Sequence, residues 1–209
     1  MPHPTLEDVI HAITEKRTQD SSRLAPLADY IRLEHEEYGL PGVRGGTGGE
    51  LKIQGMARDK DWDVAYNFAG KDRLLISLKS MWSNASGTVP NRIDDLMGEA
   101  ANVQQMAPEV VTGYVVIFDA KADSTRRDGR LWSQFFEDSV KRLTIRKAPL
   151  WNQGLLEGTW FIRIDSRNPR GSRVVNPTKA AAAGREFFLS LLRELVHREP
   201  AIPLTKPLP

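Results

Sequence analysis

The segment DWDVAYNFAGKDRLLISLK, residues 61–79, contains two runs of apolar, β-branched and aromatic residues that are separated by a short Ala-Gly turn. Runs of this length and composition predict two strands, 61–68 and 74–79, joined as a hairpin. Because side chains alternate between the two faces of a strand, Ser77 and Lys79 would share one face, and the leucine between them would point into the opposite layer. This hairpin forms the first two strands from which the rest of the predicted sheet is assigned.

Helical and strand patterns alternate around the hairpin. Further strands are predicted at 51–54, 114–118 and 159–164, and helices at 5–18, 24–38, 91–106, 131–146 and 179–197, with a glycine-rich loop at 41–49. This order predicts an α/β fold with a mixed β-sheet flanked by helices. We expect one domain over 1–209, with a helical N-terminal layer at 1–40, a core carrying the candidate site at 50–118, remaining sheet and helices at 119–199, and an extended proline-rich tail at 200–209.

Composition excludes several classes of function. The chain of 209 residues has no cysteine, which excludes disulfides, thiol catalysis and cysteine-ligated zinc, and is typical of a reducing cytoplasm. No stretch approaches the roughly 20 apolar residues that span a bilayer, so we expect a cytoplasmic protein without a membrane partner. The net charge of +2 does not by itself indicate a nucleic-acid partner.

The chemistry of the hairpin centres on three side chains. Asp63 can supply an oxygen ligand to a hard divalent ion, and Lys79 on the next strand can orient or help to deprotonate a water, with Ser77 beside the metal. This is the combination that metal-dependent phosphodiester hydrolysis needs. The alternative is that Lys79 is a surface residue at a strand end and Asp63 is an acid that flanks a turn.

A wider set of motifs resembles a known family. The chain carries, in this order, Trp62-Asp63-Val64, Ser77-Leu78-Lys79-Ser80, a Ser/Asn/Gly-rich stretch, and Asn91-Arg92-Ile93-Asp94-Asp95. Over about 60–118 this resembles the core of XhoI-type restriction endonucleases, within the PD-(D/E)XK superfamily. The resemblance implies a Type II restriction endonuclease that cleaves double-stranded DNA at a specific, palindromic site with Mg²⁺ (or Mn²⁺). It departs from the pattern at Ser77, where an acid is usual. A palindrome-cutting enzyme of this size is expected to be a homodimer, because palindromy mirrors two-fold symmetry.

The acid that would replace the one missing at Ser77 has three candidates. Asp95 and Glu99 lie four residues apart on one face of the predicted helix, and other superfamily members with SxK take this acid from the helix that follows. Asp95 is preferred, and Asp63, Asp95 and Glu99 form the expected metal ligands. Glu50, directly after the glycine loop, is the third candidate. Asn91 is expected to cap the helix as a pair with Asp94.

Polar and basic groups near strand ends are candidates for DNA contact, through phosphates or base edges. They come from the expected loop 80–91 and from two arginine-rich loops: Ser80, Trp82, Ser83, Asn84, Asn91, Arg92, Arg126, Arg127, Arg130, Arg167, Arg170 and Arg173. The alternatives are a buried Trp82 and loops that only solubilise the protein. Two other functions stay open: another PD-(D/E)XK DNA-processing nuclease, or a catalytically inactive DNA-binding relative.

Overall fold

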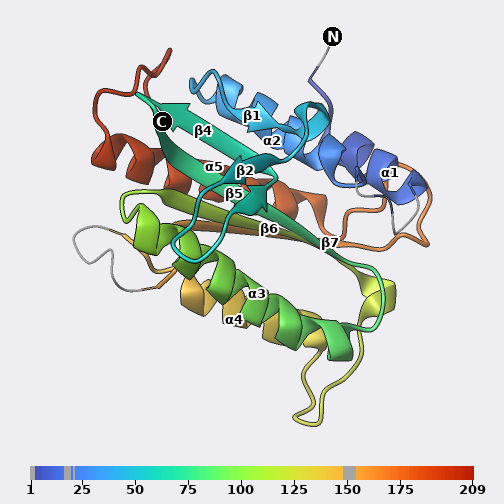
Figure 1. Ribbon diagram of the computed structural model, residues 1–209. Coiled ribbons are helices and arrows are strands. Elements are labelled where there is room, and N and C mark those ends of the chain that lie inside the picture. The colour runs from blue at the N-terminus through green and yellow to red at the C-terminus, as the bar shows by residue number, and fades with distance from the viewer. Residues whose placement is uncertain (1–2, 17–19, 21, 148–153) are drawn as a thin grey trace.

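A five-stranded mixed sheet forms the centre of the protein. The computed structural model describes residues 3–16, 20, 22–147 and 154–209. The strand order is β1-β4-β5-β6-β7, with β4 antiparallel to β1 and β5, and with β5, β6 and β7 parallel (Figure 1). Their bounds are β1 Arg44–Gly45, β4 Val64–Phe68, β5 Lys71–Met81, β6 Val111–Asp119 and β7 Gly158–Ile164.

Helices cover both faces of this sheet. On one face lie α1 Leu6–Glu15, α2 Ala25–Glu37 and α5 Pro177–Arg198; on the other lie α3 Ala85–Met106 and α4 Trp132–Leu143 (Figure 1). Short 3₁₀ turns, η1 Gly46–Gly48 and η2 Ala120–Ala122, follow β1 and β6. The predicted class, an α/β fold with a mixed sheet between helices, is therefore confirmed. None of the described helices is long and apolar enough to cross a membrane.

The alternation of β5 determines where the candidate site lies. Leu74, Ile76 and Leu78 are buried in the cluster under α1, α2 and α5. Ser77 and Lys79 consequently point toward α3 on the other face, where both contact a side chain of that helix. This is the orientation that strand periodicity predicts.

The predicted strand 61–68 is wrong in one respect, because it is divided at Asp63. Residues before it form β3 Lys60–Trp62, which pairs with β2 Leu51–Ile53 as a separate two-stranded sheet, and residues after it form β4. The division has a packing cause. Trp62 is buried in a small cluster with Val103 of α3, whereas Val64 belongs to the cluster on the opposite face of the main sheet.

The start of α3 differs from the prediction, and the expected loop 80–91 is also wrong. Ser80 belongs to β5, and α3 begins at Ala85. Asn84 caps it: the residue has a left-handed backbone (φ 46°), and its side chain accepts a hydrogen bond from the Gly87 N–H at 3.3 Å. Asn91 therefore lies inside the helix and forms no capping pair with Asp94. Pro90 lies inside the helix, in its second turn, although an interior proline usually ends a helix.

The two ends of the chain differ in part from the predicted helix 5–18 and the predicted extended tail 200–209. The helix predicted over 5–18 ends at Glu15, and the last residues of that prediction, 17 and 18, lie outside the described residues. Residues 200–209 form neither helix nor strand, as expected, but they pack on the domain. Ile202 is 5% exposed, and the Thr205 N–H donates to the Gly39 carbonyl at 2.8 Å, just beyond α2.

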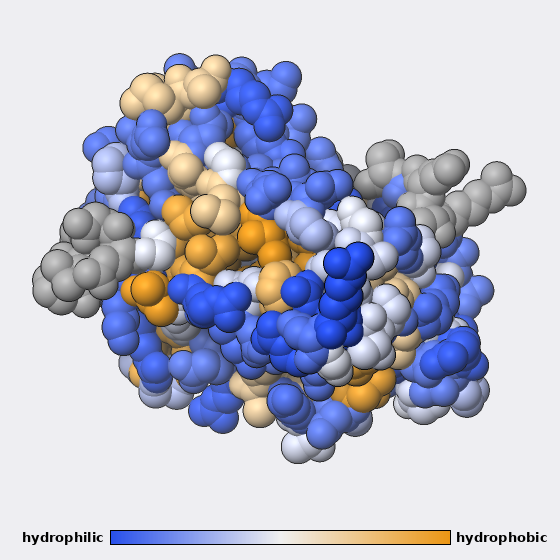
Figure 2. Space-filling model, turned by 90° about the horizontal axis from the view of Figure 1, so that it is seen from below, coloured by the Kyte–Doolittle hydropathy of each residue, from blue (hydrophilic) through white to orange (hydrophobic). Residues whose placement is uncertain are grey.

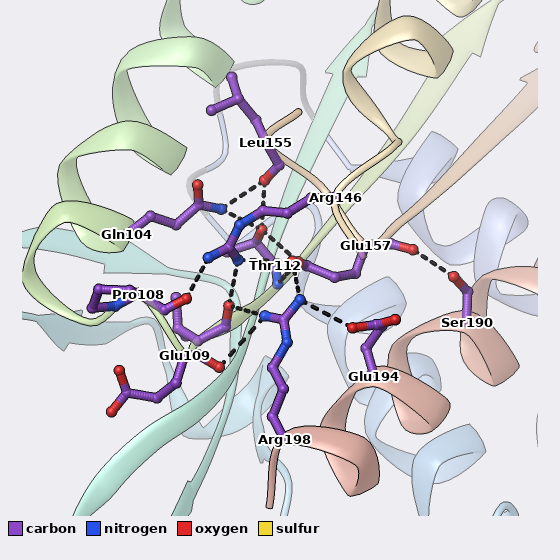
Figure 3. A network of polar contacts seen from close by, with 11 residues as sticks. Gln104, Pro108, Glu109, Thr112, Arg146, Leu155, Glu157, Ser190, Glu194 and Arg198 are labelled. Carbon is purple, nitrogen blue, oxygen red and sulfur yellow. Dashed lines mark hydrogen bonds and ion pairs between the residues drawn. The ribbon is translucent and has the colours of Figure 1, made fainter. Parts of the chain in front are cut away.

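A buried ion-pair network lies at the amino ends of β6 and β7 and connects them (Figure 3). Glu157 accepts from the guanidinium groups of Arg146 and Arg198, both at 2.7 Å, and from the backbone N–H of Thr112. It joins the connection before β7 to the C-terminal turn of α5. Lys79 lies near the carboxyl end of β5, so the network is at the opposite end of the sheet.

Candidate functional site

Glu99 of α3 is the side chain around which the candidate residues gather. It is 9% exposed, and its Oε2 accepts from the Ser77 hydroxyl at 3.3 Å. Its Oε1 lies 3.5 Å from the Lys79 ammonium and 3.1 Å from that of Lys60 on β3. The site therefore consists of a buried carboxylate held by one hydroxyl and two lysines, where β5, β3 and α3 meet.

Asp63 occupies the point where β4 leaves the main sheet. In the β4–β5 ladder Val64 lies opposite Ile76, and Trp62, which would continue the ladder toward Leu78, pairs in the other sheet. The Asp63 side chain replaces this missing backbone partner, because its Oδ2 accepts a hydrogen bond from the Leu78 N–H at 2.7 Å. Asp63 Oδ1 receives no hydrogen bond from the described residues, so one oxygen remains available.

The environment of Asp63 opposes its negative charge. Burial raises the pKa of its carboxyl to about 6, and the charges of Glu50 and Glu99 push the pKa in the same direction. The Leu78 hydrogen bond and the Lys79 charge act the other way but do not outweigh burial. A cation next to this carboxylate would relieve the unfavourable charge.

A cleft of about 490 Å³ opens beside Asp63. It lies between the start of α2 and the glycine loop, and its lining includes Lys16, Thr47, Glu50 and Asp63. Glu50 is exposed and lines this cleft, whereas Glu99 is buried. Of the three candidate acids, the structure thus places Glu99 against Ser77 and Lys79, and Glu50 at the open side of Asp63.

Asp95 lies one helical turn before Glu99 but points into a more open region. Its side chain is 50% exposed and pairs with Arg92 at 3.2 Å. Neither Ser77 nor Lys79 has a hydrogen bond or ion pair to Asp95 within the described part of the chain. The preference for Asp95 over Glu99 is therefore not supported by the contacts at the site.

Lys60 and Tyr114 belong to the site although sequence reasoning did not select them. Tyr114 lies beside Ser77 in the β5–β6 ladder, and its buried hydroxyl has no hydrogen-bond partner among the described residues. Burial, followed by the charge of Glu99, raises the pKa of Tyr114. A buried hydroxyl without a partner is costly, which favours a bound polar group there. In the sequence, only the position of Lys60 three residues before Asp63 could have indicated its role. Nothing in the sequence indicates Tyr114, because the register between two strands depends on residues far apart in the chain.

The donor set suits a hard divalent ion only in part. No group of three or more His, Asp or Glu side chains within the described residues is close enough to hold a metal by itself. Mg²⁺ needs fewer protein ligands, because it is commonly bound through one or two carboxylates with waters and substrate oxygens completing its octahedron. Asp63 and Glu99 offer such oxygens, and the raised pKa of Asp63 is consistent with a place for positive charge. The residues present therefore offer Mg²⁺ or Mn²⁺ at most two carboxylates, so water and substrate oxygens would have to supply the other ligands.

The candidate DNA contacts between residues 82 and 91 fall into two groups. Trp82 is 8% exposed, with the Arg23 guanidinium 3.7 Å from its ring centre, so it belongs to the interior. Ser83 and Asn84 are exposed in the short link to α3, and Asn91 is exposed on that helix. Only the second group can reach a ligand without rearrangement.

The two arginine-rich loops lie at the same end of the sheet as Lys79, because β5, β6 and β7 are parallel and end in register at Met81, Asp119 and Ile164. In the first loop, Arg127 is exposed and forms no ion pair with a described residue. Its neighbours are engaged: Arg126 stacks on Phe135 at 3.7 Å, and Arg130 pairs with Asp128 at 2.8 Å.

The second loop is bound more tightly to the protein. Arg173 pairs with Glu15 of α1 at 3.2 Å and donates to Thr14, so it ties the loop to the N-terminal helix. Arg167 pairs with Asp165 at 2.7 Å, and Arg170 lies 3.7 Å from Asp8; both remain exposed.

Comparison of the chain with protein-family models, curated proteins and solved structures gave no match.

Proposed function

We propose that this protein is a Mg²⁺-dependent endonuclease of the PD-(D/E)XK kind that hydrolyses double-stranded DNA at a specific site, as Type II restriction endonucleases do. The observation that carries the proposal is the position of Glu99. Its carboxylate reaches Ser77 and Lys79 from α3, so an acid lies beside the lysine although the strand itself lacks one. The alternation of β5 and the division at Asp63 add the second carboxylate nearby.

Each residue has a defined task in this proposal. Bound Mg²⁺ or Mn²⁺ would supply Lewis acidity at the scissile phosphate and lower the pKa of a water. Asp63, through its free Oδ1, and Glu99 would hold the ion, and Ser77 would fix the orientation of Glu99. Lys79 would orient the attacking water and stabilise its deprotonated form, which attacks phosphorus directly and displaces the leaving oxygen without a covalent enzyme intermediate.

The proposed partners follow from this activity. A palindromic site suggests a homodimer, and the exposed Arg127 at the lysine end of the sheet is the best-placed arginine for DNA. We propose the cytoplasm as the compartment, in agreement with the absence of cysteine.

Cleavage of a defined plasmid in the presence of Mg²⁺, followed by sequencing of the fragment ends, tests the proposal. Glu99→Gln keeps the size of the side chain and should lower the rate by at least about a hundredfold. Asp95→Asn, one turn away, is the matched control and should retain activity. If wild-type protein gives no cleavage with either Mg²⁺ or Mn²⁺, the nuclease proposal is refuted.

One observation favours the second candidate, a DNA-binding relative without catalysis. Lys60 and Lys79 both contact Glu99 Oε1, so two ammonium groups already balance the carboxylate that would ligate the ion. Fragment ends distinguish the remaining nuclease alternatives. Uniform ends indicate a restriction-type enzyme, and scattered ends indicate another DNA-processing nuclease.

A further inference from the structure

A hydrophobic pocket of about 370 Å³ lies between α2 and α5, on the face of the sheet opposite to α3 and Glu99 (Figure 1). Sites for small organic molecules usually occupy about 300–1,000 Å³ and combine apolar walls with a few polar groups. The walls of this pocket include four aromatic side chains, Tyr30, Tyr38, Trp160 and Phe188. None of them belongs to the proposed nuclease site, so the pocket needs an explanation of its own.

The four rings form one connected group. The Tyr38 ring stacks on Phe188 of α5 with ring centres 5.8 Å apart, and the centre of the Tyr30 ring lies 6.2 Å from that of Trp160. Trp160 and Phe188 are buried and form the floor, whereas the two tyrosines are partly exposed and form a wall. The Trp160 indole N–H already donates to the Ala180 carbonyl at 2.9 Å. The floor therefore offers a ligand ring surface rather than a hydrogen-bond donor.

The charged side chains of the wall indicate the class of ligand. Hydrophobic surface alone does not do so, and Figure 2 shows that hydrophobic residues also gather in a hollow between polar rims on the face seen from below. In the pocket between α2 and α5, the lining has two acids, Glu7 and Glu34, and one base, Arg185. Arg185 is exposed. The lining is therefore net negative and favours a positively charged ligand over an anion.

Glu34 is the acid that is available to such a ligand, because Glu7 is engaged by the protein. The two carboxylate oxygens of Glu7 accept from the backbone N–H groups of Val174 and Arg173, at 2.9 and 3.2 Å. Glu34 lies one helical turn after Tyr30 and four residues before Tyr38. Its side chain is 20% exposed, so the carboxylate is largely removed from water although it lines an apolar pocket.

A side chain of the protein shows which contacts this wall supports. Within the described residues Glu34 has one ion-pair partner, the imidazole of His3, at 3.6 Å. The same imidazole meets the Tyr30 ring edge-on, with ring centres 5.5 Å apart. A nitrogen-containing group thus contacts the carboxylate and the aromatic ring at once. No lysine or arginine among the described residues forms an ion pair with Glu34.

We propose that this pocket binds a small organic cation with an apolar body, of the alkylammonium class. The charged nitrogen would lie between Glu34 and the two tyrosine rings, and the apolar body would lie on Trp160 and Phe188. A cation near the face of an aromatic ring is attracted by the quadrupole of the ring, most strongly where water is excluded. A fully alkylated nitrogen suits these walls, because it has no N–H groups that need acceptors. The inference concerns a separate site and does not depend on the cleavage chemistry.

Titration calorimetry of the full chain with phenyltrimethylammonium tests the proposal. The comparison ligand is tert-butylbenzene, which has the same shape but carries carbon in place of the charged nitrogen, and it should bind at least about tenfold more weakly. Glu34→Gln should weaken binding of the cation by about tenfold or more, whereas Arg185→Gln should tighten it because a like charge is removed. Glu36→Gln is the matched control on α2. This acid is exposed, pairs with Arg32 and is not part of the wall, so the affinity should not change.

A second measurement locates the ligand without any variant. In the NMR spectrum of wild-type protein, the indole N–H signal of Trp160 should shift when phenyltrimethylammonium is added. The signal of Trp132 on α4, which covers the other face of the sheet, should stay in place. The proposal is overturned if the cation does not bind at millimolar concentrations or if tert-butylbenzene binds equally well. It is also overturned by unchanged affinity in Glu34→Gln, by weaker binding in Arg185→Gln, or by binding that leaves the Trp160 signal unshifted.

Discussion

Replacing Asp63 with asparagine should make the stability of the protein depend less on pH. The carboxyl of Asp63 has a pKa of about 6 in the folded protein, compared with 3.8 for an ordinary aspartate. The folded state therefore binds a proton more strongly than the unfolded chain does. This contribution to stability is fully present below pH 4 and is lost as the pH rises through 6.

The magnitude follows from the two pKa values. A rise from 3.8 to about 6 corresponds to about 3 kcal/mol of folding free energy lost between pH 4 and pH 8. Asparagine avoids this loss because it has no charge, and its amide oxygen can still accept from the Leu78 N–H. We therefore expect Asp63→Asn to match wild type near pH 4 and to be more stable by about 3 kcal/mol at pH 8.

Urea denaturation of both proteins from pH 4 to pH 8 measures this difference. Asp95→Asn, a half-exposed carboxylate on α3, is the control and should run parallel to wild type. Adding Mg²⁺ above pH 6 should stabilise wild type and leave the Asp63→Asn variant unchanged, because a cation relieves the charge that asparagine lacks. A difference that stays constant with pH would show that burial of Asp63 has little effect on its pKa.

Three further predictions concern other parts of the molecule. Lys60→Gln should tighten binding of Mn²⁺ in the absence of DNA, measured by titration calorimetry, because the lysine competes with a cation for Glu99; weaker binding would show instead that Lys60 positions the carboxylate. Glu157→Gln should destabilise the fold by about 3–5 kcal/mol in urea denaturation, since it removes the buried carboxylate that the Arg146 and Arg198 guanidinium groups share, and wild-type stability would contradict this. Arg127→Ala should flatten the dependence of DNA affinity on salt by about one phosphate contact, whereas Arg173→Ala should change thermal stability and leave that slope unaltered; equal slopes for wild type and both variants would remove Arg127 from the interface.

Local patterns predicted four of the five strands of the main sheet, but not their boundaries, and they missed β1, which lies within the predicted glycine-rich loop 41–49. The apolar alternation of 74–79 predicted both the strand and the shared face of Ser77 and Lys79, because period-two alternation depends only on neighbouring residues. The division at Asp63 was missed because its cause is distant in sequence: Trp62 packs with Val103 of α3. A strand can change sheets at one residue without any local change in composition.

The candidate site was predictable to the same extent. Helical periodicity places Asp95 and Glu99 on one face of α3, so it selects both acids and ranks neither. Which of the two acids contacts Ser77 and Lys79 depends on where α3 crosses β5, and long-range packing determines that position. Lys60 reaches Glu99 only because the β2–β3 sheet folds over the main sheet, and Tyr114 reaches the site only through the register between β5 and β6. Contacts of this kind cannot be predicted from a local sequence pattern.

The contact between Ser77 and Glu99 indicates how the proposed active site would function without an acid on its strand. A glutamate at position 77 would point toward α3, where Glu99 already lies, and would bring two carboxylates into one buried space. Serine is short enough to leave that space to Glu99, and its hydroxyl donates to the carboxylate at 3.3 Å. The two lysines contribute two positive charges at that point, whichever element carries the acid. In the proposed site, position 77 and position 99 are therefore alternative sources of one negative charge, and Ser77 leaves room for the carboxylate that α3 supplies.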